Sequence, residues 1–557
     1  MAPKTVAITN DGVQAIKDSV DHVDNLIAQA RASDEADQRL TIRGALAHHK
    51  TAVFWSMVLS LSLVMEGYDL VIINSFYGQE QFQRRFGTPV PSKPGTYGIT
   101  PSWQSGLSNS ALVGQLTGLL INTWAQDRFG CRKTMMFFMV WMVCAIFIPF
   151  FSPSLGVLAF GEVMCGIPWG VFQTLSTTYA SEVVPTILRP YATSWVCMCW
   201  GLGILISSGV VRGVAEIDGN LAWRLPFALQ WVWPVPLFIA AYFAPESPWN
   251  AVRREKPDEA RQSLNRLLPD GEDKPQRVEA SLAYIQYTTE LEKAETAGAT
   301  FADCFRGTNL RRTEINCVVW AAQILCGNAL LGFSVEFLEA AGFSATRADD
   351  VNIALSACYI IGGVVCWFLM PHFGRATIYI AGCSIMFMFL IVIGGLGFAD
   401  SASAKTAIAI LFVITTLVNM ITTGPACYPI VAETPSGRLR YKTVTIGRFV
   451  YNLTGIFSNS VTPRMVSPLG WNWGAKAALF YAGTDLLCII WCWFRLPETK
   501  DRPFGEIDIL FDNKVPARAF KYTSVVQFEG LGSETGSLSS GKDDKTAAIH
   551  NVEKIDL

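Results

Sequence analysis

The feature that most constrains this chain is a series of twelve apolar segments, each about as long as a helix that crosses a lipid bilayer. Charged residues make up only 16% of the chain, against about 25% in an average soluble protein. Because a segment in lipid must satisfy its own backbone hydrogen bonds, each one is predicted to be a helix. The sequence therefore predicts an all-α membrane protein with twelve transmembrane helices. The segments lie near 53–76, 104–125, 134–152, 155–179, 191–211, 226–244, 314–338, 352–370, 376–398, 406–431, 444–466 and 475–496.

The polar stretch between the sixth and seventh segments sets the predicted orientation. It carries eleven Lys and Arg residues, and two basic loops, Arg128–Lys133 and Arg438–Lys442, fall on the same side. The positive-inside rule places this side in the cytosol, and an even number of spans puts both termini there. The expected order is a cytosolic tail at 1–50, a six-helix bundle at 51–244, a cytosolic loop with helices at 245–313, a second six-helix bundle at 314–497, and a cytosolic, partly disordered tail at 498–557.

Short sequence patterns recur in the two halves at nearly constant spacing. The pattern EVVPTILR at 182–189 follows the fourth segment, and ETPSGRLR at 433–440 follows the tenth, 251 residues later. PES at 245–247 and PET at 497–499 follow the sixth and twelfth, 252 residues apart. A Phe-Gly pair with an Arg close behind it also ends the second and eighth. This recurrence predicts two six-helix repeats, with a substrate bound between them near the bilayer midplane.

The repeated patterns put a carboxylate and a guanidinium at the cytosolic ends of helices. Salt bridges between them, across the two halves, are expected to lock an inner gate while the outer gate is open. The plainer alternative is that they are solvated loop charges. The expected gate residues are Asp127, Arg128, Arg132, Glu182, Arg189, Glu246, Glu433, Arg438, Arg440 and Glu498.

Charged side chains also lie inside the predicted spans, where each costs at least a few kcal/mol unless it is compensated. Glu66 and Asp69 are three residues apart in the first span and so lie on one helix face. Arg448 in the eleventh span is the expected counter-ion. These three residues are predicted to couple proton binding to transport, and the alternative is an ion pair that only orders the bundle. Glu162 lies early in the fourth span, and Asp485 in the twelfth is expected to be interfacial and structural.

Amide and aromatic side chains inside the spans are suited to a polyhydroxyl ligand. Amides both donate and accept hydrogen bonds, and aromatic rings can stack on a sugar ring. For any single residue, packing between helices is the alternative role. The candidate substrate-binding residues are Gln115, Gln173, Gln323, Asn328, Tyr428, Asn452 and Trp200.

Several other classes of protein are disfavoured by the sequence. A net charge of −2 indicates no polyanionic partner such as a nucleic acid. The 14 cysteines lie mostly inside apolar segments and form no CxxC pair, so neither a metal site nor a disulfide framework is expected. HExxH, GxSxG and phosphate-loop motifs are missing. We therefore expect no enzyme activity and no cofactor. Any accumulation of a substrate against its concentration gradient must be driven by an ion gradient.

Taken together, the motifs resemble the sugar-porter branch of the major facilitator superfamily, and more narrowly the fungal maltose/α-glucoside:proton symporters. PESP and PETK after the sixth and twelfth segments are typical of sugar porters. FALQWVWPVPL and VPARAF are typical of the α-glucoside branch. The matching stretches are MEGYD (65–69), CGIPWGVFQTLSTTYASEVVP (165–185), LPFALQWVWPVPL (225–237), FAPESPW (243–249), SGRLRYKTV (436–444), NWGAKAALF (472–480), LPETKDRPFGEID (496–508) and VPARAFKYT (515–523).

The resemblance implies a twelve-helix transporter that takes up a disaccharide across the plasma membrane of a fungal cell, driven by protons, and that works as a monomer. It also implies that Asp69 and Glu66 couple the proton with Arg448 nearby. Gln323, Asn328 and Tyr428 would line the sugar site. Two of the departures from the family pattern are Gln115 in place of Glu and Ile204 in place of Gln. They leave two alternatives open: uptake, export or uncoupled diffusion of a different metabolite, and a non-transporting sugar sensor.

Overall fold

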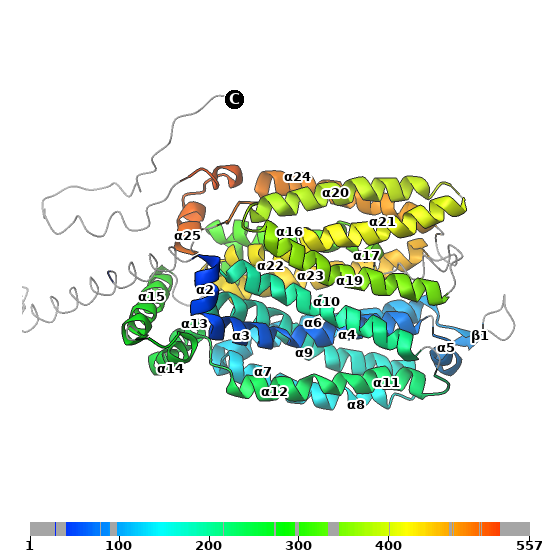
Figure 1. Cartoon of the computed structure of the whole chain (residues 1–557), viewed down its shortest axis with the longest axis horizontal. Helices are drawn as coiled ribbons and strands as arrows, with labels where there is room; N and C mark the ends of the chain where they lie inside the picture. The colour runs from blue at the N-terminus through cyan, green and yellow to red at the C-terminus, as the bar shows by residue number, and fades with distance from the viewer. Residues whose placement is uncertain are drawn as a thin grey trace, which may run out of the picture.

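The computed structural model arranges the helices side by side in two groups, with a cap of shorter helices at one end (Figure 1). It describes residues 28, 41–77, 79–89, 97–185, 187–214, 217–271, 274–295, 300–331, 345–399, 401–466, 471, 473–500, 502 and 504–523. Most of the predicted N-terminal tail, and the C-terminal tail beyond residue 523, therefore lie outside the described residues.

The first half contains the six predicted spans, several of them broken into shorter helices. A small antiparallel pair, β1 (Thr88–Pro89) and β2 (Tyr97–Gly98), lies between the first two spans. The helices are α2 (Ile42–His48), α3 (Lys50–Ser60), α4 (Ser62–Phe76), α5 (Glu80–Phe86), α6 (Pro101–Phe129), α7 (Cys131–Ala145), α8 (Phe147–Phe150), α9 (Leu155–Val183), α10 (Arg189–Val214), α11 (Leu221–Leu229), the 3₁₀ turn η1 (Gln230–Val232) and α12 (Pro234–Phe243).

The central segment and the second half follow the same plan. The central segment forms α13 (Pro248–Arg253), α14 (Pro257–Leu267), α15 (Lys274–Glu295) and the turn η2 (Phe301–Phe305). The second half contains α16 (Gly307–Leu325), α17 (Asn328–Leu331), α19 (Ala345–Leu369), α20 (Arg375–Leu396), α21 (Ala402–Ile421), α22 (Thr423–Glu433), η3 (Gly437–Leu439), α23 (Arg440–Val466), η4 (Gly474–Lys476) and α24 (Ala477–Arg495), followed by α25 (Phe504–Asp512) and η5 (Ala517–Ala519).

Helix pairing shows the internal repeat directly. In the first half α4 packs against α10, α6 against α9, and α7 against α12. In the second half the pairs are α16 with α23, α19 with α21, and α20 with α24. These are the same positions within each set of six spans, so the predicted pair of six-helix repeats is confirmed. The proposed boundaries at 51–244 and 314–497 stay a prediction.

Nine helical segments in the described part of the chain are long and apolar enough to cross a membrane. The helices at the second, seventh and eleventh predicted spans, α6, α16 and α23, are not among them. Each carries many polar residues. α6 and α16 both pack against α23, the former across the two halves. α6 and α23 thus meet at the interface between the halves, and α16 packs against α23 from within the second half, so all three helices cover part of their surface with protein.

Close helix contacts depend on glycine at specific positions. A Cβ on Gly67 of α4 would overlap the backbone oxygen of Trp200 on α10, and one on Gly203 of α10 would overlap that of Val64. The two helices can therefore approach this closely only without these side chains. This contact fixes the part of α4 that carries the two predicted proton-coupling carboxylates.

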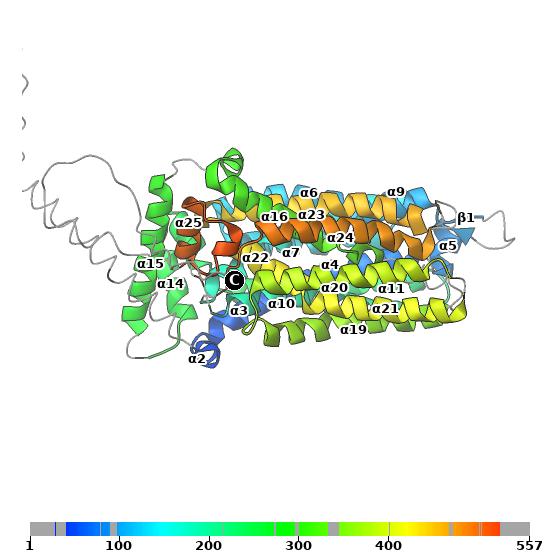
Figure 2. The same cartoon turned by 90° about the horizontal axis from the view of Figure 1, so that it is seen from above.

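The cap lies at the end of the bundle that we call the inner end, following the positive-inside prediction. α13, α14, α15 and α25 lie there together with α2, while β1 and α5 lie at the opposite end (Figures 1 and 2). Both described ends of the chain are thus on one side of the bundle, as an even number of spans requires.

Candidate functional site

A buried polar cluster joins the two halves around Glu66, which is 2% exposed. Gln173 on α9 donates to Glu66 Oε1 through Nε2 at 2.5 Å, and Gln115 on α6 donates to the same oxygen at 3.3 Å. Arg448 on α23 lies with Nη2 3.6 Å from Glu66 Oε1. Its Nε also donates to Gln173 Oε1 at 2.7 Å. One guanidinium from the second half therefore holds both a carboxylate and an amide of the first.

Aromatic rings of the second half hold the Arg448 guanidinium in place. Its carbon lies 4.1 Å from the ring centre of Tyr451 and 4.5 Å from that of Trp320. Trp320 in turn packs edge-on against Tyr428, with ring centres 5.1 Å apart. Cation–π contact of this kind compensates a desolvated arginine by about 2 kcal/mol or more. Tyr451 was not predicted from the sequence, although it lies one helical turn beyond Arg448.

The structure separates the two carboxylates of α4. Asp69, also 2% exposed, accepts a hydrogen bond at Oδ1 from Nε2 of Gln230, in the turn η1. Its other neighbour is the carboxyl group of Glu162 on α9. The expectation that Asp69 pairs with Arg448 is wrong, because that arginine is held against Glu66 instead. Gln230 was missed from the sequence because it lies in an aromatic, proline-rich stretch that shows no polar periodicity.

The remaining predicted substrate residues lie in the second half or at its interface. Gln323 on α16 donates to the backbone oxygen of Gly424 at 3.3 Å, and Asn328 accepts from Asn419 on α21 at 3.1 Å. Asn452 on α23 is fully buried, and neither polar atom of its side chain has a hydrogen-bond partner among the described residues. The indole of Trp200 lies next to Glu66, and its ring centre is 5.8 Å from that of Tyr359 on α19. Trp200 thus lies beside the Glu66 cluster, whereas the hydrogen bonds of Gln323 and Asn328 stay within the second half.

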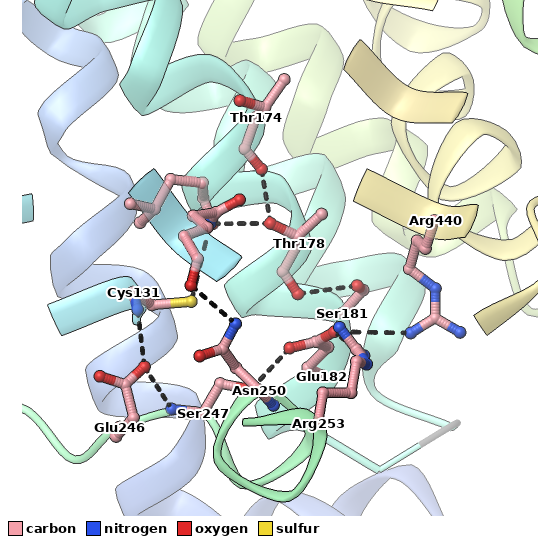
Figure 3. Close-up of polar contacts among 12 residues, drawn as sticks. Cys131, Thr174, Thr178, Ser181, Glu182, Glu246, Ser247, Asn250, Arg253 and Arg440 are labelled. Carbon is pink, nitrogen blue, oxygen red and sulfur yellow. Dashed lines mark hydrogen bonds and ion pairs between the residues drawn. The ribbon is translucent and has the colours of Figure 1, made fainter. Parts of the chain in front are cut away.

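The predicted inner gate contains two ion pairs that cross between the halves. Glu182, at the end of α9, lies 3.8 Å from Nη1 of Arg440 at the start of α23 (Figure 3). Asp127 of α6 lies 3.8 Å from Nζ of Lys442. Glu182 and Arg440 are buried, whereas the Asp127 side chain is 54% exposed. Removing one partner from a buried pair costs about 3–5 kcal/mol, but an exposed pair contributes only about 0–1 kcal/mol. The buried pair therefore dominates this contact.

Within each half, the repeated carboxylates make equivalent contacts. Glu182 accepts a hydrogen bond from Ser247 Oγ at 2.5 Å, and Glu433 accepts one from Thr499 Oγ1 at 2.7 Å. Glu182 also pairs with Arg253 at 2.6 Å (Figure 3), and Glu433 with Arg375 at 3.5 Å. The hydroxyl contacts thus follow the sequence repeat, whereas the two arginines come from different places in each half: Arg253 from α13 and Arg375 from the start of α20.

Glu246 and Glu498 do not bridge the halves, contrary to the prediction. Glu246 Oε1 accepts from the backbone N–H of Cys131 at 2.7 Å (Figure 3), and Glu498 Oε2 from that of Thr377 at 3.4 Å. Each thus binds the start of a helix of its own half, α7 or α20, where the helix dipole favours a carboxylate. Burial raises the pKa of Glu246, and its backbone hydrogen bonds oppose that shift. The loop glycine Gly130, at φ 89°, leaves room for this carboxylate, which a Cβ would contact at 2.7 Å.

The other predicted gate residues have different contacts. Arg128 is exposed, and Arg132 lies over the ring of Tyr242 in its own half, 5.7 Å from the ring centre. The side chain of Arg438 lies outside the described residues. Arg189 and Arg440, one from each half, lie on the ring of Phe504, with guanidinium carbons 3.7 Å and 3.8 Å from its centre. Phe504 was not predicted as a gate residue because it follows the last span.

Two six-helix halves, with a buried polar cluster between them and charged contacts at one end, define a multi-pass membrane transporter. The chain belongs to the sugar transporter family: the family model described as "Sugar (and other) transporter" matches residues 55–511.

Proteins similar to this chain occur in yeast. It is 38% identical over 541 residues to a general alpha-glucoside permease of Saccharomyces cerevisiae, covering 94% of this chain and 87% of the relative. It is 36% identical over 536 residues to a maltose permease of the same yeast, covering 96% and 87%. The fold matches that of the proton:xylose symporter XylE bound to 6-bromo-6-deoxy-D-glucose, with a TM-score of 0.71, 19% identity and coverage of 83% of this chain and 100% of XylE.

Proposed function

We propose that this protein takes up an α-glucoside such as maltose across the plasma membrane together with a proton, by alternating access. The observation that carries the proposal is the buried contact of Glu66 with Gln173 and Arg448, which joins a carboxylate, an amide and a guanidinium across the two halves. The yeast relatives named as alpha-glucoside and maltose permeases support the choice of substrate class.

The Glu66 contact supplies a way to link proton binding to movement of the halves. While Glu66 is ionised, its attraction for Arg448 holds the first half against the second. When Glu66 is neutral the charge pair is lost, and Arg448 keeps only its hydrogen bond to Gln173 and its aromatic neighbours. A ligand moves an equilibrium only if it binds the two states with different affinities. The protonated form of Glu66 therefore favours a different arrangement of the halves from the one that the ionised form favours.

Buried polar atoms at the interface support a hydroxyl-rich substrate. Among the described residues, Asn452 Nδ2 and Oδ1, Gln115 Oε1 and Trp320 Nε1 are buried without a hydrogen-bond partner. Leaving such groups unpaired costs about 1–3 kcal/mol each, and sugar hydroxyls both donate to and accept from groups of this kind. Tyr428 and Trp320 supply aromatic faces beside them. We take these residues, with Gln323 and Asn328, as the sugar-binding surface, and the two six-helix bundles as the moving halves.

The test is uptake of labelled maltose by host cells that lack their own α-glucoside carriers, with and without a protonophore. Accumulation that the protonophore abolishes supports the proposal. If the protein is at the cell surface and maltose is neither taken up nor competes with other glycosides, the substrate assignment is wrong. Maltose uptake that ignores the protonophore contradicts proton coupling.

A further inference from the structure

A second acidic centre lies in the first half, away from the Arg448 cluster. The carboxyl groups of Asp69 on α4 and Glu162 on α9 lie against each other, and the residues are 2% and 1% exposed. Among the described residues, Asp69 Oδ2, Glu162 Oε1 and Glu162 Oε2 all lack a hydrogen-bond donor. Three carboxyl oxygens of this pair are thus buried without a donor among the described residues.

The surroundings of this pair contain no compensating cation within the described part of the chain. The polar donor is Gln230 Nε2, which is fully buried and binds Asp69 Oδ1. The nearby titratable groups are Cys165 on α9 and Tyr68 on α4, and the Tyr68 hydroxyl donates to the backbone oxygen of Pro226 instead. Arg448 is held by Glu66 and does not act on this pair.

Two carboxylates in contact, both buried and with no cation beside them among the described residues, repel each other strongly when both are ionised. A proton placed between them removes one charge and supplies the missing donor to the facing oxygens. The structure therefore assigns to Asp69 and Glu162 a shared binding site for one proton, with Gln230 as the residue that holds Asp69 in place. This inference rests on the proposed function, because a transported proton is what gives such a site a role.

The site and the Glu66 cluster are linked through α4. Asp69 lies three residues after Glu66, and side chains at this spacing are neighbours about 5–6 Å apart at Cβ. A charge appearing on the pair therefore raises the cost of a charge on Glu66, and so changes the attraction between Glu66 and Arg448. Proton loss from the Asp69–Glu162 pair is in this way transmitted to the contact between the halves.

Two substitutions should move the pH dependence of uptake in opposite directions. Glu162→Gln removes the neighbouring acid and provides an amide donor, so Asp69 ionises more easily; half-maximal accumulation then needs a proton concentration about tenfold higher. Gln230→Leu removes the donor to ionised Asp69, so half-maximal accumulation shifts toward alkaline pH.

A general defect in folding lowers uptake at every pH and does not give opposite shifts. Asp485→Asn, a buried carboxyl of α24, is the matched control and should keep the wild-type profile.

A sugar-independent measurement separates this inference from the proposed function. Infrared spectra of reconstituted wild-type protein, minus those of the Asp69→Asn/Glu162→Gln double variant, should contain a protonated-carboxyl band that disappears as pH rises. A difference spectrum without this band overturns the shared site, and so do unchanged pH profiles in both single variants. If the band is present but the wild type transports no α-glucoside, the proton site stands and the substrate assignment fails.

Discussion

Arg448 lies 3.6 Å from Glu66, and this ion pair connects the eleventh span to the first across the interface between the two halves. The same guanidinium donates to Gln173 at 2.7 Å and lies on the rings of Trp320 and Tyr451. A single side chain thus contacts a carboxylate, an amide and two aromatic rings. We therefore expect its shape as well as its charge to matter.

Arg448→Lys tests whether shape matters at this position. Lysine keeps the charge but cannot reach the carboxylate and the amide with a planar fork, and it stacks less well on aromatic rings. We expect initial uptake of labelled maltose to fall about tenfold or more, which corresponds to about 1.4 kcal/mol. Arg464→Lys, at an exposed position of the same helix, should leave uptake unchanged. Equal uptake by both variants would show that only charge is needed at Arg448.

Glu182→Gln tests the buried inner-gate pair. The substitution removes the charge that faces Arg253 and Arg440, and we expect a loss of about 3–5 kcal/mol of stabilisation of the closed inner end. The inner end should then open more often, which can be measured as faster alkylation of a cysteine introduced beside the gate. The control Asp127→Asn breaks only an exposed pair and should change the rate little. The gate assignment fails if the two variants react at the same rate.

Gly67→Ala tests the close approach of α4 and α10. A methyl group there would overlap the backbone of Trp200, which cannot move aside as a side chain can. We expect a lower melting temperature in detergent and less protein at the cell surface. Gly209→Ala, on α10, has nothing within 4 Å of the added Cβ and should be neutral or slightly stabilising, because alanine favours helix. A Gly67→Ala protein as stable as wild type would contradict the packing described here.

Phe504→Ala tests whether the segment after the last span holds the inner end together. The ring contacts two arginines that belong to different halves, and without it their mutual repulsion is no longer offset by the aromatic face. We expect faster opening of the inner end and a lower ratio of internal to external sugar. Tyr522→Ala, which removes an aromatic ring that is 79% exposed, is the control. Identical accumulation ratios for the two variants would remove Phe504 from the gate.

The sequence predicted the number and positions of the spans because apolar length in lipid leaves few alternatives to a helix. The repeat was also predictable, since its motifs keep the same register in both halves. Partners of individual carboxylates were not predictable, because two residues on one helix face can bind different side chains of the same neighbouring helix, as Glu66 and Asp69 do on α9. Asp69 therefore has Glu162 and Gln230 as neighbours instead of Arg448.

Glu246 and Glu498 likewise bind backbone N–H groups, which no motif marks. Asp485 is fully buried and not interfacial, since its side chain faces the interior of its own half.

The most direct test of proton coupling across the halves is transport by Glu66→Gln in reconstituted vesicles, with an imposed proton gradient and without one. The substitution keeps the size of the side chain but makes its link to Arg448 independent of protonation. We predict that this variant exchanges labelled maltose across the membrane without a gradient, yet no longer concentrates it when the gradient is imposed. Accumulation equal to that of the wild-type protein would contradict the assignment of Glu66 and Arg448 as the coupling link.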